Sequence, residues 1–250
     1  MFGWKVAPGA LAVTAAALVV SVSAWPSPAA ADLRDLIFGS RKSSDERRAP
    51  AVYVAEGGPR FIVDRSTDLT LLKFEGSAEL WVLSPSPAPR GDIIYRDDVG
   101  RPILRFTKLG GVTIFEGVRS GGSPASFAGR TTALRLQAFN AQALLQRLAQ
   151  ASVRASRAAG RLIVFDAPDV TSGSEAVYAD AAAVAAEAVA ALAQRTNGRR
   201  TTQKIARIQL VQNGKVDAAM NGNTLVVSLT PRRGVAGRPS SRRIIAAATR

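Results

Sequence analysis

Short runs of β-branched and aromatic residues, each ended by residues that form turns, occupy residues 52–117 of this 250-residue chain. This pattern predicts antiparallel strands that follow one another along the chain, a β-meander. Gly76 and Gly100 supply the backbone freedom that such tight connections need. Residues 84–89 alternate proline with small residues, which predicts a surface crossing or a sheet edge. The predicted strands are residues 61–65, 69–74, 79–83, 92–96, 103–108 and 112–115.

A mixed pattern of helical and strand periodicities follows in residues 131–230. Each predicted helix ends near a glycine, Gly160 or Gly198, suited to a left-handed C-cap. Ser172 and Glu175 have the spacing of a capping box at the start of the second helix. The predicted helices are residues 141–159 and 174–196, and the predicted strands are residues 133–139, 162–165, 205–212, 215–220 and 224–229.

The last three of these strands are joined by Asn213-Gly214 and Asn221-Gly222, the strongest short signal for a β-hairpin. They predict a three-stranded antiparallel meander at the C-terminal end of this half. The predicted fold class is therefore α+β, with an N-terminal antiparallel β-meander followed by a mixed unit of two helices and this closing meander.

Residues 1–31 have the pattern of a secretory signal peptide. A positive charge precedes an uncharged apolar run over residues 10–22, and the alanines at 29–31 favour cleavage before Asp32, with an earlier site before Trp25 as the alternative. A membrane anchor is the competing interpretation, but a helical span needs roughly 20 apolar residues. We expect an exported protein, periplasmic or secreted, with no transmembrane span after cleavage.

Changes in composition predict the remaining boundaries. The first part of the linker carries Leu33, Leu36 and Ile37 at helical spacing, which favours docking on the body of the protein or on a partner. A single core shared by the two folded units is the alternative to two domains. The predicted parts after the signal peptide are a linker at 32–50, a β-meander unit at 51–118, a Gly/Ser-rich connection at 119–130, an α+β unit at 131–230 and a basic tail at 231–250.

The chain contains no histidine and no cysteine. Their absence excludes a Ser-His-Asp triad, a thiol nucleophile, a disulfide framework and any site in which these residues ligate a metal. Catalysis by carboxylates alone, as in glycosidases, stays open as an alternative, with Glu75, Glu79, Asp92 and Glu116 as its candidate residues.

Asp166 and Asp169 follow an apolar strand in a loop, a position where α/β sheets place metal ligands. Their oxygens are of the kind that Mg²⁺ or Ca²⁺ prefers. Capping of a polar loop around Pro168 is the simpler interpretation, because other carboxylates are scarce nearby. We expect neither a metal nor a cofactor.

The whole chain has a formal net charge of +14, and the excess positive charge is concentrated in its second half. Residues 32–118 hold thirteen basic and thirteen acidic side chains, whereas residues 119–250 hold nineteen and six. The tail after Pro231 contains no acid, and its glycines predict an exposed segment without regular structure, although Ile244 and Ile245 could dock. The predicted polyanion-binding residues are Arg147, Arg154, Arg157, Arg199, Arg200, Arg232, Arg233, Arg238, Arg242 and Arg243.

Several short segments resemble an uncharacterised family of bacterial exported proteins. They include Asp64-Arg65-Ser66, Leu72-Lys73-Phe74-Glu75-Gly76-Ser77, Trp81-Val82-Leu83-Ser84-Pro85, Pro89-Arg90-Gly91-Asp92, Leu109-Gly110-Gly111-Val112-Thr113 and Gly237-Arg238-Pro239-Ser240-Ser241. The resemblance covers most of the chain after the signal peptide and implies a bacterial, envelope-side protein. It implies no catalytic residues.

These features predict a non-catalytic envelope protein that binds an anionic envelope polymer or an envelope protein through its basic second half. A carboxylate-based periplasmic hydrolase is the alternative. Nucleic acid is disfavoured as the partner, because export separates it from the protein and aromatic stacking residues are sparse in this half. Contact with a membrane surface remains open.

Overall fold

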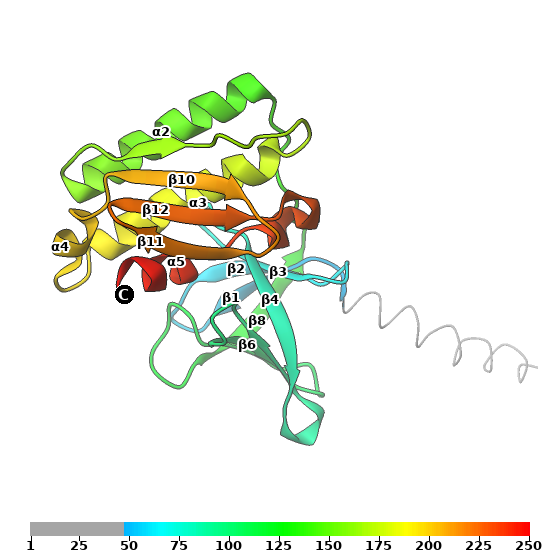
Figure 1. The fold of residues 1–250 in the computed structure, drawn as a ribbon. Helices are drawn as coiled ribbons and strands as arrows, with labels where there is room; N and C mark the ends of the chain where they lie inside the picture. Colours follow the sequence, from blue (N-terminus) through cyan, green and yellow to red (C-terminus); the bar gives the residue numbers. More distant parts are fainter. Residues whose placement is uncertain (1–47) are drawn as a thin grey trace, which may run out of the picture. The chain divides into compact units, whose positions relative to one another are not determined.

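A computed structural model describes residues 48–250 (Figure 1). The predicted signal peptide and all of the predicted linker before Arg48 lie outside the described residues. The end of the linker is fixed to the body, because the carbonyl of Arg48 accepts from the Arg65 N–H at 3.2 Å and that of Pro50 accepts from the Thr131 N–H at 3.1 Å. The described residues belong to one compact unit.

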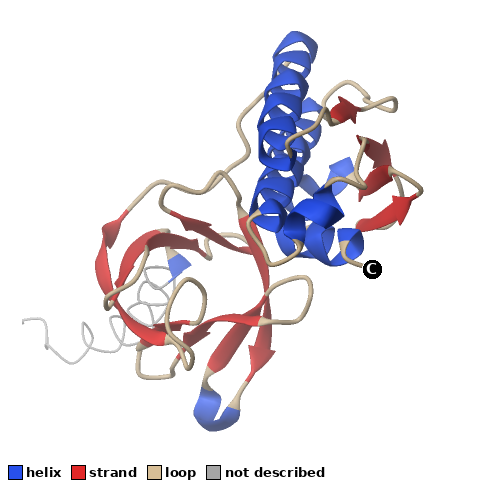
Figure 2. Ribbon diagram, turned by 90° about the vertical axis from the view of Figure 1, so that its left-hand side faces the viewer, coloured by secondary structure: helices blue, strands red, loops and turns tan. Residues whose placement is uncertain are grey.

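Antiparallel strands β1 to β8 form a closed barrel in the first part of the described chain (Figure 2). Aromatic rings line its interior. Tyr53 stacks on Phe61 with 5.8 Å between the ring centroids, and Phe106 meets Tyr53 and Tyr95 edge to face. The alternation of apolar and polar residues along each strand places these rings inside. The strands are β1 (Ala51–Ala55), β2 (Arg60–Asp64), β3 (Thr70–Phe74), β4 (Trp81–Pro87), β5 (Ile93–Arg96), β6 (Pro102–Phe106), β7 (Val112–Ile114) and β8 (Ser123–Arg130), with a 3₁₀ turn η1 (Pro89–Gly91) between β4 and β5.

The barrel closes where β8 pairs with β1, and Tyr53 lies opposite Phe127 across this seam. Their rings meet edge to face at 6.1 Å. The prediction of a simple meander is therefore wrong, and the segment predicted to be a Gly/Ser-rich connection contains β8. The small residues of this segment form a strand because β1 and β7 each offer it an edge for pairing.

The proline-rich half of β4 is an edge, as predicted. Residues 84–87 pair with β5, whereas β3 reaches only the first half of the strand, from Trp81 to Leu83. Proline has no backbone N–H to donate. Because no strand pairs with residues 84–87 on the side away from β5, Pro85 and Pro87 leave no neighbouring strand without a hydrogen bond there.

The second sheet has the strand order β11-β12-β10-β9 and contains both parallel and antiparallel pairs. The prediction of an antiparallel meander at this point is therefore wrong. The hairpin at Asn221-Gly222 is confirmed, but β12 pairs with β10 in parallel, so Asn213-Gly214 does not form a hairpin. Leu225, Val227 and Leu229 are fully buried, which suits β12 to the centre of the sheet. The strands are β9 (Val164–Asp166), β10 (Arg207–Gln212), β11 (Asp217–Asn221) and β12 (Thr224–Leu229).

Both predicted helices are present, as α2 (Ala141–Ala159) and α3 (Glu175–Ala193). The Asn140 side chain caps α2 by accepting from the Ala143 N–H at 2.8 Å, and Gly160 ends it in the predicted left-handed conformation. The ends of α3 differ from the prediction. Ser174 occupies the N-cap position, and Glu175 accepts from the Gly173 N–H instead of forming a capping box with Ser172.

The chain after α3 turns at Asn197, which adopts the left-handed conformation predicted for Gly198. Gly198 instead begins the short helix α4 (Gly198–Thr202). A Cβ at this glycine would lie 1.8 Å from the Leu192 carbonyl oxygen, so close approach, rather than a positive φ, requires the glycine.

Helix α3 is the centre of the second core. It packs against α2, β10 and β12, and the helices lie together on one side of the sheet (Figure 2). Within residues 48–250, α3 is the one helix long and apolar enough to cross a membrane, a property that we did not predict for any segment after the signal peptide. Because 61% of its apolar stretch is buried inside the protein, it has the character of a core helix.

The basic tail is ordered, contrary to the prediction. It forms a 3₁₀ segment η2 (Pro231–Gly237) and a helix α5 (Ser241–Ala248), whose Ile244 and Ile245 are buried in the core around α3. Ser240 caps α5 by accepting from the Arg243 N–H at 3.1 Å. Residues 133–139, predicted to be a strand, pair with no other strand in the described structure.

Candidate functional site

The ten arginines predicted to bind polyanions do not form one surface. Arg238, Arg242 and Arg243 take part in ion pairs that join the tail to the rest of the protein. Arg157, Arg199 and Arg200 are exposed at the end of the second sheet where α2 finishes and α4 lies (Figure 1). The other four, Arg147, Arg154, Arg232 and Arg233, lie elsewhere.

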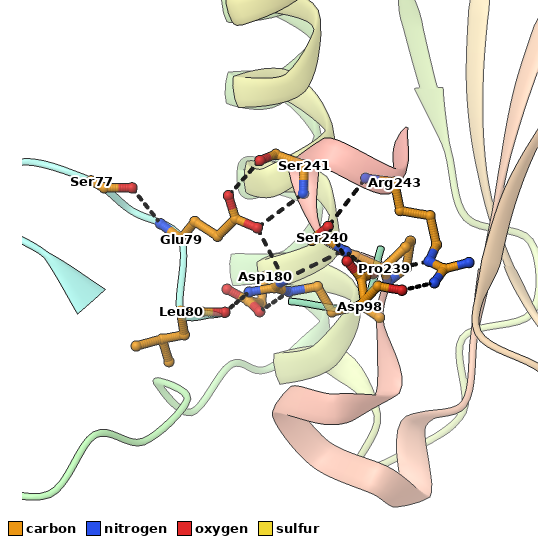
Figure 3. A network of polar contacts seen from close by, with 10 residues as sticks. Ser77, Glu79, Leu80, Asp98, Asp180, Pro239, Ser240, Ser241 and Arg243 are labelled. Carbon is orange, nitrogen blue, oxygen red and sulfur yellow. Dashed lines mark hydrogen bonds and ion pairs between the residues drawn. The ribbon is translucent and has the colours of Figure 1, made fainter. Parts of the chain in front are cut away.

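Arg238 is only 5% exposed and connects three segments of the chain. Its Nε donates to Asp180 of α3 at 2.5 Å, and its Nη2 donates to the Leu80 carbonyl at 2.7 Å. Its Nη1 lies 3.6 Å from the Glu79 carboxylate, which also accepts from the Ser241 N–H at 2.9 Å and hydroxyl at 2.6 Å (Figure 3). The buried guanidinium is thus engaged by partners inside the protein and is not available to a ligand.

Arg242 lies over the indole ring of Trp81, with 4.9 Å between the guanidinium carbon and the ring centroid. Its Nη1 is 3.1 Å from the Asp97 carboxylate, and its Nη2 pairs with Glu116. The Arg242 side chain is only 13% exposed, and its largely buried charge is neutralised by these two barrel carboxylates.

Arg243 and Ser240 share one barrel carboxylate. Arg243 Nε donates to Asp98 at 3.0 Å, and Asp98 also accepts from the N–H and the hydroxyl of Ser240 (Figure 3). A second acid, Asp217 of β11, lies 3.6 Å from Arg243. The expectation of an exposed, solvated tail is wrong because carboxylates on barrel loops and on α3, distant in sequence, pair with its arginines.

A group of exposed cations lies at one end of the second sheet. Arg161, just past the end of α2, donates to the carbonyl of Gln203, which follows α4, so the two segments lie side by side. We call this surface the basic end. It consists of Arg157, Arg161, Arg195, Arg199, Arg200 and Lys204, all exposed.

The basic end carries no acid of its own. No Asp or Glu occurs in residues 188–216, and within the described structure none of its six cations forms an ion pair. Sequence analysis singled out Arg157, Arg199 and Arg200 but missed Arg161, Arg195 and Lys204, although the acid-free stretch is visible in the sequence. Part of the clustering has a structural reason, because Arg157 in the last turn of α2 offsets the helix dipole.

The remaining predicted arginines are dispersed. Arg154 forms an ion pair with Glu187 of α3 at 2.9 Å. Arg147 lies over the ring of Phe139, with 5.4 Å between the guanidinium carbon and the ring centroid. Arg232 and Arg233 are exposed in η2. Arg154 lies between Arg147 and Arg157 in α2, and its pairing with a carboxylate sets it apart from the six cations of the basic end.

Three of the four candidate carboxylates of a hydrolase are each engaged by a different arginine. Glu79 and Glu116 pair with Arg238 and Arg242, as described, and Asp92 accepts from Arg105 Nε at 2.8 Å and from the Lys108 N–H at 3.1 Å. The hydrogen bond from Arg105 holds the pKa of Asp92 below its ordinary value. Burial raises the pKa of Glu79, while the charge of Arg238 and hydrogen bonds from Ser241 oppose the rise. No observation therefore favours paired acid–base chemistry.

Of the two candidate metal ligands, Asp166 has partners for its carboxylate within the protein, whereas the contact of Asp169 is made by its backbone carbonyl. Asp166 accepts from Arg207 and Gln209 of β10, both at 3.3 Å. The Asp169 carbonyl accepts from the Tyr178 hydroxyl at 3.2 Å. Residues 48–250 contain no group of three or more acidic side chains placed to hold a metal ion.

The family comparison confirms the resemblance to an uncharacterised family. Residues 32–248 match a family model described as a domain of unknown function (DUF4908). No curated protein and no solved structure matches the chain.

Proposed function

Since the chain belongs to the family described as a domain of unknown function (DUF4908), we propose its function from its surface: it is an exported, non-catalytic protein that holds an anionic envelope polymer on the basic end. The observation that carries this proposal is the set of six exposed cations without an acidic partner at the end of the second sheet. Such a set produces a local positive potential that attracts polyanions.

Arginine chemistry supports a ligand rich in phosphate or carboxylate. Five of the six cations are arginines, whose planar guanidinium groups bind these anions through two parallel hydrogen bonds. Arg238, Arg242 and Arg243 of the tail belong to the internal structure, so the ligand is held by the end of α2 and by residues 195–204 instead.

Three features support export. The N-terminal residues carry the signal-peptide pattern, and the family match begins at residue 32, which is where cleavage after the alanine run would start the mature chain. A chain without cysteine also suits an oxidising compartment, because it cannot form wrong disulfides.

The binding proposal is tested by retention on an anionic matrix such as dextran sulfate. The variant Arg199→Gln/Arg200→Gln/Lys204→Gln removes three charges from the basic end. The control Arg119→Gln/Arg232→Gln/Arg233→Gln removes three exposed charges from other places and gives the same net charge. We expect the first variant to elute at clearly lower salt than the wild type, and the control to elute close to it.

Equal shifts for the two variants would show that retention follows net charge alone and would overturn the basic end as the site. Export has a separate test. Expression of the full chain in a Gram-negative host followed by N-terminal sequencing of the periplasmic fraction should give a chain beginning at Asp32, whereas retention of the uncleaved chain in the cytoplasm contradicts export.

A further inference from the structure

The segment that joins the barrel to α2 has the side-chain pattern of a strand but no partner strand. Leu134 and Leu136 are half-buried and pack on a small cluster that contains Leu71, Leu80 and Val235. Arg135 and Gln137, which alternate with the two leucines, are exposed. This period of two is typical of an extended chain lying with one face on the protein.

The backbone of this segment offers free hydrogen-bonding groups. The Leu134 N–H donates to the buried carboxylate of Asp64 at 2.8 Å, which anchors the start of the segment. Beyond this bond, the N–H and C=O groups of residues 135–139 make no hydrogen bond within the described structure. A fixed, extended backbone with unpaired groups is the feature to which an added strand binds.

A groove of about 340 Å³ runs beside the segment. The segment forms one wall, and Ala176, Ala179 and Ala183 of α3 contribute small side chains to the lining. We call this hollow the 135–139 groove. Its volume lies within the range of ligand-binding pockets, roughly 300 to 1,000 Å³.

The charges that line the groove are mostly positive. Lys73, Arg135 and Arg147 line it, and none of the three forms an ion pair in the described residues. Its acid is Asp180, whose charge is already neutralised by Arg238. A ligand that fits this charge distribution is anionic.

We propose that the 135–139 groove binds an extended, acidic peptide segment of a partner protein, which adds as a strand beside residues 135–139. The unpaired N–H and C=O groups recur at the spacing of a peptide backbone, which favours a polypeptide over an acidic saccharide. Acidic side chains of the peptide lie against Lys73, Arg135 and Arg147. This site is separate from the basic end and does not depend on the function proposed for it.

The test uses the full chain and a fluorescent hexapeptide in which glutamate alternates with valine. A matched peptide with alternate amides N-methylated keeps the charge and length but cannot form the strand ladder. We expect the first peptide to bind and the N-methylated peptide to bind at least tenfold more weakly. Arg135→Glu should weaken binding at least tenfold, whereas the exposed control Arg232→Glu should change it less than twofold.

Hydrogen exchange gives a second readout that does not need a variant. The amides of residues 135–139 should exchange rapidly in the free protein and at least tenfold more slowly with the peptide bound. Equal binding of the N-methylated peptide, or equally strong binding of an acidic oligosaccharide to this groove, would overturn strand addition. Unchanged exchange at residues 135–139 under saturating peptide would also overturn it.

Discussion

Arg238, in the segment between η2 and α5, donates to Asp180 in the first half of α3 at 2.5 Å, and both side chains are largely buried. The bond joins residues 58 positions apart. Because the same guanidinium faces Glu79 just before β4, one side chain connects the tail, the central helix and the barrel. The tail is thus joined to the rest of the folded protein through its charges.

Replacing Arg238 should be strongly destabilising. Arg238→Ala leaves Glu79 and Asp180 without their buried counter-charge, and breaking a buried pair in this way costs about 3–5 kcal/mol. Urea unfolding followed by circular dichroism measures the free energy of unfolding. Arg232→Ala, an exposed arginine in the same region, should change it by no more than about 0.5 kcal/mol. A loss below about 1 kcal/mol for Arg238→Ala would contradict the structural role.

Glu79 should make stability fall as the pH rises. Burial raises its pKa above the ordinary value of 4.5, so the folded protein binds this proton more tightly than the unfolded chain. The stabilisation is fully present below pH 4.5 and is lost as the pH rises through the raised pKa. The free energy of unfolding of the wild type should decline relative to Glu79→Gln across this window in urea titrations. A constant difference between the two proteins would contradict the raised pKa.

Asp92 should have the opposite effect. The hydrogen bond from Arg105 lowers its pKa below the ordinary value of 3.8, so its stabilisation is present above pH 3.8 and is lost as the pH falls through the lowered pKa. Thermal unfolding between pH 2 and pH 5 should show a steeper acid decline for the wild type than for Asp92→Asn. Parallel curves for the two proteins would be inconsistent with this role.

Local patterns were sufficient for the elements whose partners are near in sequence. Helix α2 has the predicted range and ends at Gly160 as predicted, and Asn221-Gly222 forms its hairpin. The barrel closure was missed for two reasons. Tyr53 and Phe127 lie near opposite ends of the barrel sequence, and β8 has no β-branched residue to indicate a strand.

The candidate site was only partly predictable for the same physical reason. Whether an arginine is free depends on the acids that reach it in space, and the partner of Ser241, Glu79, lies 162 positions away. Composition therefore located the excess of positive charge, but it could not separate Arg199 at the surface from Arg238 in the interior.

Gly198 should not tolerate a side chain. A Cβ there would lie 1.8 Å from the Leu192 carbonyl oxygen, so Gly198→Ala must displace the end of α3 and should cost about 2 kcal/mol or more. Gly214→Ala is the matched control, because nothing lies within 4 Å of its Cβ position and its φ is not positive. The control should be neutral or slightly stabilising in thermal unfolding.

Removing the tail should unfold the protein, the reverse of what its composition predicts. A chain ending at Pro231 loses Ile244 and Ile245, which are 1% and 5% exposed, and burial of each is worth about 1.5–3 kcal/mol. It also loses Arg238, which leaves Glu79 and Asp180 unpaired. Since a domain of this kind is stable by only about 5–15 kcal/mol, these losses together approach its whole stability.

The comparison is between three chains: the intact protein, one ending at Pro231 and one ending at Ala248. The longer truncation removes only exposed residues and should melt cooperatively, within a few degrees of the intact protein. The chain ending at Pro231 should lose its cooperative thermal transition and expose apolar surface to a dye such as ANS. A cooperative transition in that chain, close to the intact melting temperature, would mean that the tail is dispensable for folding and that its ion pairs contribute little.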